Sequence, residues 1–281
     1  LYSSAASDVY KRQILAPIII VFVNSFGKKV LTASEKSQES TSAIASILGE
    51  SINGISTIRS FAAEDWNIII HCHSSTADAE KLAAEINTNR ENQAKVVQAN
   101  LDKDDHVARL IEDTKNCYGR LDAIVNNASA FYPTPIGSLS QEDWDQLIGS
   151  NLKGPLFLIN GLIDMLNESK GVVINMTDMN VDRGLSKYAI YTAAKGGLLA
   201  ATKVLARELA PIIRVNAVAP GAILEPPNTS WSDEVRNRIL ANIPLGRLGT
   251  EKDIAGAVKF LVDSPYITGE VINVDGGRSL S

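Results

Sequence analysis

The chain has 281 residues, of which 45% are hydrophobic and 21% charged, and a formal net charge of -5 at pH 7. This composition excludes a disordered or fibrous chain and is sufficient for one large α/β domain. The negative charge gives no attraction to nucleic acid or anionic lipid. Its two cysteines, Cys72 and Cys117, form no CxxC motif and predict neither a disulfide framework nor a zinc site, which fits a reducing cytoplasm. We therefore expect a cytoplasmic protein with no metal, nucleic-acid or membrane partner.

The first part of the chain differs from the rest. Residues 1–13, LYSSAASDVYKRQ, show no apolar periodicity, cap or turn signal and are typical of translated adapter sequence. The apolar run at 14–23 is shorter than the roughly 20 residues that a membrane-spanning helix needs. Residues 16–64, above all ESINGISTIRSFAAE at 50–64, resemble a transmembrane-domain fragment of an ABC exporter, without any nucleotide-binding motif. The alternative for this segment is an amphipathic surface helix of the domain that follows.

The pattern changes near Asp65, where we place a junction between a foreign-looking segment, 1–65, and a main domain, 66–281. Beyond it, apolar runs of strand length alternate with helical patterns, which predicts an α/β fold with a Rossmann-type, doubly wound parallel sheet. The expected strands lie near 67–71, 94–98, 122–126, 171–176, 212–218 and 270–274. The expected helices lie near 76–89, 104–118, 141–168, 188–209 and 251–263. A proline-rich loop at 220–232 is placed to cover a ligand crevice.

Tyr191 and Lys195 are the strongest chemical signal. Four residues apart on a helix, they share one face. A nearby ammonium stabilises phenolate, so the pair is suited to proton transfer. Asp178 ends one predicted strand and Asn127 follows another, at the carboxyl edge where α/β proteins bind ligands.

Several motifs occur together in the order typical of one family. They are NNAS at 126–129, the asparagine of SNLKGP (Asn151), YxxxK at 191–195, APG at 219–221 and TGEVINVDGG at 268–277. In these motifs the region 66–281 resembles the short-chain dehydrogenases/reductases. Within that superfamily, Asp178, where most members carry serine, and NNASAFYPTP at 126–135 resemble the pteridine reductases.

The resemblance implies NADPH-dependent reduction of a pterin or dihydropterin by hydride transfer. Tyr191 would donate a proton, Lys195 would hold the ribose and lower the pKa of the phenol, and Asp178 would assist the proton step. Asn151 would hold a water of the relay, and Phe131 would stack on the pterin, an interaction that a flat heteroaromatic ring favours. The substrate site would thus comprise Phe131, Asp178 and Tyr191, and the resembled family is usually homotetrameric.

The choice of NADPH also follows from the residues after the first predicted strand. His73, Ser74 and Ser75 stand there, and no acid precedes Asp78, an arrangement that favours a 2'-phosphate over a free ribose. By resemblance, the residues expected to line the cofactor are His73, Ser74, Ser75, Asn100, Leu101, Asn127, Ala128, Ser129, Tyr191, Lys195, Pro220 and Gly221.

One family feature is not found. Neither TGxxxGIG nor GxxxRxG precedes the first predicted strand, although Gly49 and Gly54 fall near the places of two glycines, with residues 42–48 where the strand would be. We therefore expect the first strand and glycine-rich turn to be replaced or missing, and the chain to be weakly stable or weakly active. The alternatives are another short-chain reductase with a carbonyl or enoyl substrate, and an inactive chimera carrying an ABC transporter fragment.

Overall fold

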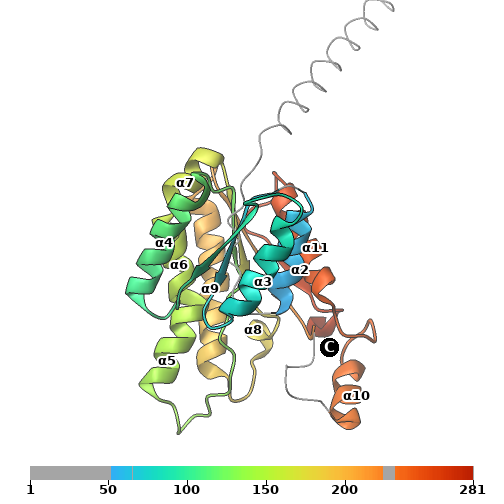
Figure 1. Ribbon diagram of the computed structural model, residues 1–281. Helices are drawn as coiled ribbons and strands as arrows, with labels where there is room; N and C mark the ends of the chain where they lie inside the picture. Colours follow the sequence, from blue (N-terminus) through green and yellow to red (C-terminus); the bar gives the residue numbers. More distant parts are fainter. Residues whose placement is uncertain (1–51, 65, 224–231, 281) are drawn as a thin grey trace, which may run out of the picture. The chain divides into compact units, whose positions relative to one another are not determined.

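The computed structural model describes residues 52–64, 66–223 and 232–280. The chain divides into two units, 1–41 and 42–281, and the described residues all lie in the second. Its strands and helices alternate along the sequence (Figure 1). They are α2 (Ile52–Ala62), β1 (Ile68–Cys72), α3 (Thr76–Asn87), β2 (Ala94–Gln98), α4 (Asp104–Tyr118), β3 (Ala123–Asn126), α5 (Gln141–Ile148), the π-helical turn η1 (Gly149–Lys153), α6 (Gly154–Gly161), α7 (Ile163–Ser169), β4 (Val172–Met176), α8 (Asn180–Arg183), α9 (Ala189–Glu208), β5 (Arg214–Pro220), α10 (Asp233–Ala241), α11 (Glu251–Asp263), β6 (Val271–Val274) and the short 3₁₀ turn η2 (Arg278–Leu280).

All strand pairs are parallel. β1 pairs with β2, and the other strands form a sheet in the order β3, β4, β5, β6. Among the described residues, no strand pairs with both β1 and β3, although a doubly wound sheet of the Rossmann type has its first strand at this place. The residues expected to supply that strand, 42–48, lie outside the described part of the chain, as does Gly49, whereas Gly54 lies in α2.

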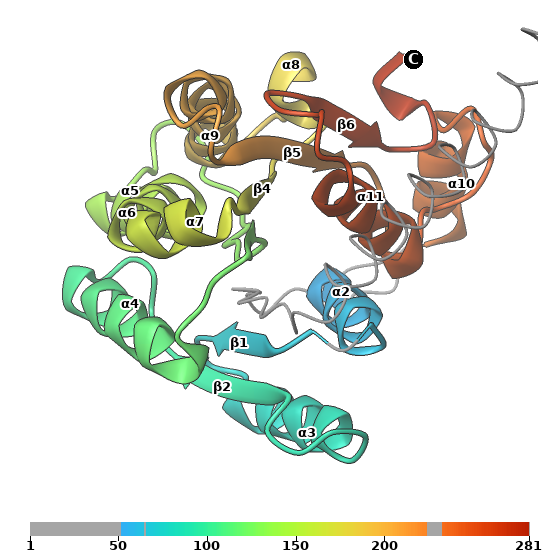
Figure 2. The same cartoon turned by 90° about the horizontal axis from the view of Figure 1, so that it is seen from above.

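Helices cover both faces of the strands (Figure 2), with α2, α3 and α11 on one side and α4, α6, α7 and α9 on the other. Side chains alternate accordingly: Ile68 and Ile70 of β1 join the first core and Ile69 joins the second, and all three are buried. Burial on both faces is typical of a doubly wound parallel sheet. The predicted fold class is therefore confirmed.

The helix α2 belongs to the first core. Ile58 and Phe61 are 2% and 1% exposed and pack with α11, and the Phe61 ring meets Trp66 edge to face with centroids 5.5 Å apart. Full burial of such side chains contributes about 1.5–3 kcal/mol each. This packing is that of an amphipathic helix of the main domain, which was the alternative interpretation of this segment. The junction near Asp65 stays a prediction.

The single helix predicted over 141–168 is interrupted. It begins with a capping box between Ser140 and Asp143, widens into η1 and breaks again at Leu162. Pro155 lacks the N–H that would bond back one turn, which favours a widened turn before it. A Cβ on Gly149 would lie 2.7 Å from Cα of Asp102, so only glycine allows η1 to approach the chain after β2 this closely.

Two short helices were not predicted. α8 has four residues, too few for a periodic pattern. α10 is capped by Ser232, whose hydroxyl accepts from the N–H of Val235 and could have signalled a helix start. Within the described ranges, no helix is long and apolar enough to cross a membrane.

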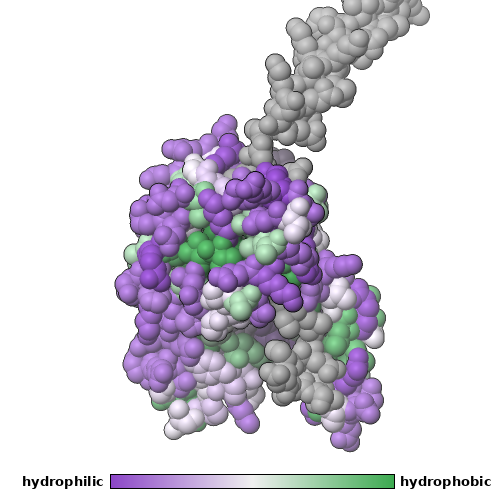
Figure 3. Space-filling view, viewed as in Figure 1, coloured by the Kyte–Doolittle hydropathy of each residue, from purple (hydrophilic) through white to green (hydrophobic). Residues whose placement is uncertain are grey.

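The side of the molecule on which α3 and α4 lie is mostly hydrophilic, with a small hydrophobic area between these two helices (Figure 3). An open groove there is lined partly by Val96, Val97 and Cys117. Lys95 crosses it, donating to the carbonyl of Cys117 and lying 4.5 Å from the centre of the Tyr118 ring. A lysine on an outer strand discourages pairing with another chain.

Candidate active site

Tyr191 and Lys195 lie on one face of α9, as predicted, and both are buried. The Lys195 Nζ donates to the carbonyl of Met176 at 2.8 Å and lies 5.9 Å from the centre of the Tyr191 ring. Burial lowers the pKa of Lys195 to about 8, and the negative charge of Asp178 opposes this shift. α9 thus brings an ammonium close to a phenol beneath the end of β4.

Asp178 completes this group. It follows β4, and its Oδ2 accepts a hydrogen bond from the hydroxyl of Tyr191 at 2.8 Å. Its Oδ1 accepts two hydrogen bonds from Asn180, from the backbone N–H at 2.7 Å and from Nδ2 at 2.8 Å. Asn180 was not predicted as a site residue, although an aspartate such as Asp178 often accepts a hydrogen bond from the backbone N–H two residues later.

The electrostatics of Tyr191 differ from the prediction. Burial raises the pKa of the phenol, the charge and hydrogen bond of Asp178 raise it further, and the Ser129 hydroxyl opposes them. We expected Lys195 to lower this pKa, but burial of the phenol determines the direction, and the Asp178 carboxylate beside the hydroxyl reinforces it. Tyr191 therefore stays protonated at neutral pH and is poised to donate a proton.

Asn151 ties the loop after β3 to η1. It is fully buried, its Nδ2 donates to the carbonyls of Ala130 and Leu147 at 2.9 Å, and its Oδ1 accepts from the Ser129 hydroxyl at 2.7 Å. π-helical turns are frequent at functional sites. The amide thus fixes Ser129 at the site, while its role in holding a water stays a prediction.

Phe131 lies next to Tyr191. Its ring stacks on Tyr188 with centroids 4.6 Å apart and meets the Tyr191 ring edge to face at 4.8 Å, yet it is 53% exposed. The loop is anchored where Thr134 donates to the carbonyl of Lys187 at 2.6 Å. An aromatic wall therefore stands beside the phenol.

A cavity of about 130 Å³ opens at the carboxyl ends of β1, β2 and β3. Its lining includes five residues predicted to contact the cofactor: His73, Asn100, Leu101, Ala128 and Ser129. His71, Ala130, Gln146 and Ser150 complete it, so no carboxylate lines the cavity to repel a phosphate. The described residues therefore fit part of a nicotinamide dinucleotide.

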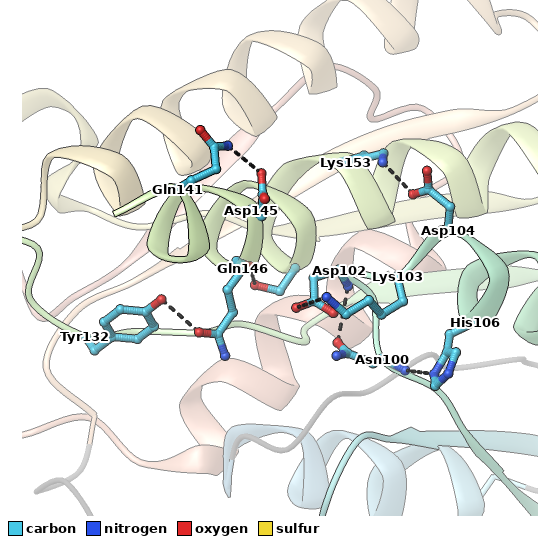
Figure 4. A network of polar contacts seen from close by, with 11 residues as sticks. Asn100, Asp102, Lys103, Asp104, His106, Tyr132, Gln141, Asp145, Gln146 and Lys153 are labelled. Carbon is cyan, nitrogen blue, oxygen red and sulfur yellow. Dashed lines mark hydrogen bonds and ion pairs between the residues drawn. The ribbon is translucent and has the colours of Figure 1, made fainter. Parts of the chain in front are cut away.

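A polar network supports one side of this cavity (Figure 4). The side-chain Oδ1 of Asn100 accepts the N–H of Asp102 at 3.2 Å, and the Nδ1 of His106 accepts the N–H of Asn100 at 3.1 Å. Gln146, which lines the cavity, accepts the hydroxyl of Tyr132 at 2.8 Å. His106 was missed because a histidine in a first helical turn carries no signal by itself.

The other predicted cofactor residues lie around the same edge of the sheet. Ser75 is the N-cap residue of α3 and Ser74 precedes it, so both stand at a helix N-terminus, where phosphate binds favourably. Asn127 is buried directly after β3. Pro220 ends β5, and a Cβ on Gly221 would lie 2.6 Å from Cα of Asp275.

Comparisons with known proteins agree with this geometry. A family model described as enoyl-(acyl carrier protein) reductase matches residues 50–279, and a model of the ABC transporter transmembrane region matches residues 13–66. The 3-oxoacyl-[acyl-carrier-protein] reductase FabG of Staphylococcus epidermidis is 36% identical over 228 residues, 80% of this chain and 93% of that protein. The 3-oxoacyl-[acyl-carrier-protein] reductase of a Synechocystis strain is 36% identical over 244 residues, 84% of this chain and 97% of that protein.

These relatives contradict the pteridine reductase interpretation, which is wrong. It depended on Asp178 and on one short motif around Phe131, whereas the similarity to 3-oxoacyl reductases extends over most of both chains. An aspartate and an exposed aromatic ring are single features, and a site that binds another substrate can also contain them. Phe131 and Asp178 therefore lie at the site, but they do not identify a pterin.

Proposed function

Because the chain belongs to the short-chain dehydrogenase/reductase family, we propose that it reduces the ketone of a 3-oxoacyl thioester to a hydroxyl with NADPH. The observation that carries this proposal is the protonated Tyr191 next to Lys195, in a chain whose relatives over most of its length are named for 3-oxoacyl reduction. When bound, the nicotinamide supplies the hydride for the carbonyl carbon. The chain's own residues must supply the proton and the orientation.

Tyr191 is the proton donor of the proposed reaction. Its hydroxyl proton, held by Asp178 before the reaction, passes to the carbonyl oxygen of the substrate as that oxygen gains negative charge. The Lys195 ammonium then stabilises the phenolate that remains, because a buried opposite charge favours the charged form. Asn151 keeps Ser129 in place beside the phenol.

The residues present fit NADPH at two places. Lys195 and Tyr191 would hold the nicotinamide ribose, and His73, Ser74 and Ser75 at the start of α3 would hold the 2'-phosphate. The glycine-rich turn of the family has no counterpart in the sequence before β1. We therefore expect weaker cofactor binding than in a member that has this turn.

The test measures the loss of NADPH absorbance with 3-oxobutanoyl and 2-butenoyl thioesters in parallel. We expect turnover of the 3-oxo compound only, and Tyr191→Phe should lower kcat by about 10²–10⁴-fold, because it removes the donated proton and keeps the ring. Tyr266→Phe, at a fully exposed tyrosine, is the matched control and should not change the rate. Faster turnover of the enoyl thioester, or full activity of Tyr191→Phe, would contradict the proposal.

We also propose that the protein is a homo-oligomer. Trp144 on α5, Phe157 on α6 and Val204 on α9 are large apolar side chains about half exposed or more, which suits a contact between copies of the chain. Sedimentation of the purified chain should give a mass above that of one chain, and Phe157→Glu with Val204→Glu should reduce it. A single-chain mass before substitution would contradict this part of the proposal.

A further inference from the structure

Asp178 has both carboxylate oxygens engaged, each by a different element. Asn180 donates twice to Oδ1, through its backbone N–H and its Nδ2, while Tyr191 on α9 donates to Oδ2. With one oxygen held by two donors, the other oxygen has little freedom to turn away from the phenol. The orientation of Asp178 toward Tyr191 is therefore fixed largely by Asn180.

Asn180 is itself held firmly. The carbonyl of Asn180 accepts the N–H of Gly184 at 2.8 Å, and the carbonyl of Asp178 accepts the N–H of Val181 at 3.2 Å. Met179, between them, is buried and donates its N–H to Pro220 at the end of β5. These contacts join α8 to the carboxyl edge of the sheet, so the two amide donors of Asn180 are preorganised.

We infer that Asn180 is a positioning residue, which holds the Asp178 carboxylate against the Tyr191 hydroxyl and so keeps the phenol in its proton-donating form. The role of the phenol rests on the proposed function, whereas the contact between the three side chains does not. No motif of the sequence assigns a role to Asn180.

The consequence is a change in the titration of Tyr191. The charge and hydrogen bond of Asp178 both raise the pKa of the phenol, so a carboxylate free to turn away raises it less. Lys195 on α9 and Asp182 and Arg183 on α8 are charged residues of the same two helices, and a substitution of Asn180 leaves these charges in place. The shift can therefore be assigned to the orientation of Asp178.

The experiment compares Asn180→Ala with Asp178→Asn, which removes the charge itself. Asn116→Ala is the matched control, since Asn116 is exposed on α4 and its Nδ2 donates to the carbonyl of Glu112 one helix turn earlier. Two readouts are taken. One is the basic limb of the pH profile of kcat for the 3-oxobutanoyl thioester. The other is phenolate absorbance of the cofactor-free protein, with a Tyr191→Phe variant subtracted to isolate this tyrosine.

We expect the basic limb and the phenolate titration of Asn180→Ala to move to lower pH by about 0.5–1 unit, in the same direction as Asp178→Asn and by a smaller amount, because the backbone donor remains. Asn116→Ala should not move either. Unchanged titration of Asn180→Ala beside a shifted Asp178→Asn would overturn the inference. Absence of turnover in the unsubstituted protein would contradict the proposed function instead, and the phenolate titration would still decide the role of Asn180.

Discussion

Replacement of Lys195 by methionine should separate stability from activity. Lys195 is completely buried, and its burial lowers its pKa from 10.5 to about 8. At neutral pH the folded protein thus carries an ammonium that would be more stable in water. Methionine has a similar length and no charge. The Lys195→Met protein should therefore lose the reductase activity, while its free energy of unfolding at pH 7 should be no lower than that of the unsubstituted protein.

The magnitude follows from the linkage between proton binding and folding. Since the pKa of the folded form lies below that of the unfolded chain, the burial cost is fully present below about pH 8 and is relieved as the pH rises toward 10.5. Each pH unit in this window is worth about 1.4 kcal/mol. The free energy of unfolding of the unsubstituted protein should therefore rise by about 2–3 kcal/mol relative to Lys195→Met between pH 7 and pH 10.

Urea unfolding at several pH values measures this difference. Groups that titrate in both proteins cancel, and Lys203→Met, at an exposed lysine of the same helix, should show a gap close to zero throughout. A gap between Lys195→Met and the unsubstituted protein that does not change with pH would refute the reasoning. It would mean that the amine of Lys195 titrates alike in the folded and unfolded chain.

Three further substitutions test the glycine approach at the sheet edge, with a matched control, and a helix cap. Gly221→Ala should lower the free energy of unfolding by about 1–3 kcal/mol and weaken NADPH binding, because the new Cβ would meet the backbone of Asp275 at 2.6 Å. Gly256→Ala in α11 meets nothing within 4 Å and should instead stabilise by up to about 1 kcal/mol, and chemical denaturation with cofactor titration distinguishes the two. Thr250→Ala removes the capping box with Asp253 and should cost about 1 kcal/mol in the same unfolding assay without changing kcat, whereas an unaltered midpoint would show that the cap is dispensable.

The sequence predicted the elements whose patterns are long and regular. The strands at β1, β2 and β4 and the helices α3, α4, α9 and α11 lie within a few residues of their expected positions. The interruption at η1 was not predicted, because it depends on a close approach of Gly149 to Asp102, a contact between residues far apart in the chain. Such contacts follow from packing and leave no periodic signal.

The site shows the same division between local and distant causes. The positions of Tyr191 and Lys195 follow from helix periodicity alone, and their common face was confirmed. The predicted direction of the Tyr191 pKa was wrong, because this pKa depends first on burial of the phenol and then on the Asp178 carboxylate, which follows β4 thirteen residues earlier. The substrate was also wrong, since a few residues of the site were given more weight than the whole domain.

Segment 50–66 shows why similarity and structural role need not coincide. Both family models include these residues, one as part of a reductase and the other as part of a transporter. In the structure, Ile55, Ile58 and Phe61 of α2, spaced three residues apart, pack into the core beside α11.

A helix position over a sheet requires only an apolar stripe at this period, which many unrelated amphipathic helices provide. A phosphate-binding turn requires glycines at fixed places, because the backbone must approach the ligand without a Cβ. A foreign segment can thus satisfy the packing of the domain far more easily than its binding of a dinucleotide, so the lack of a family glycine turn should affect cofactor affinity more than the stability contributed by α2.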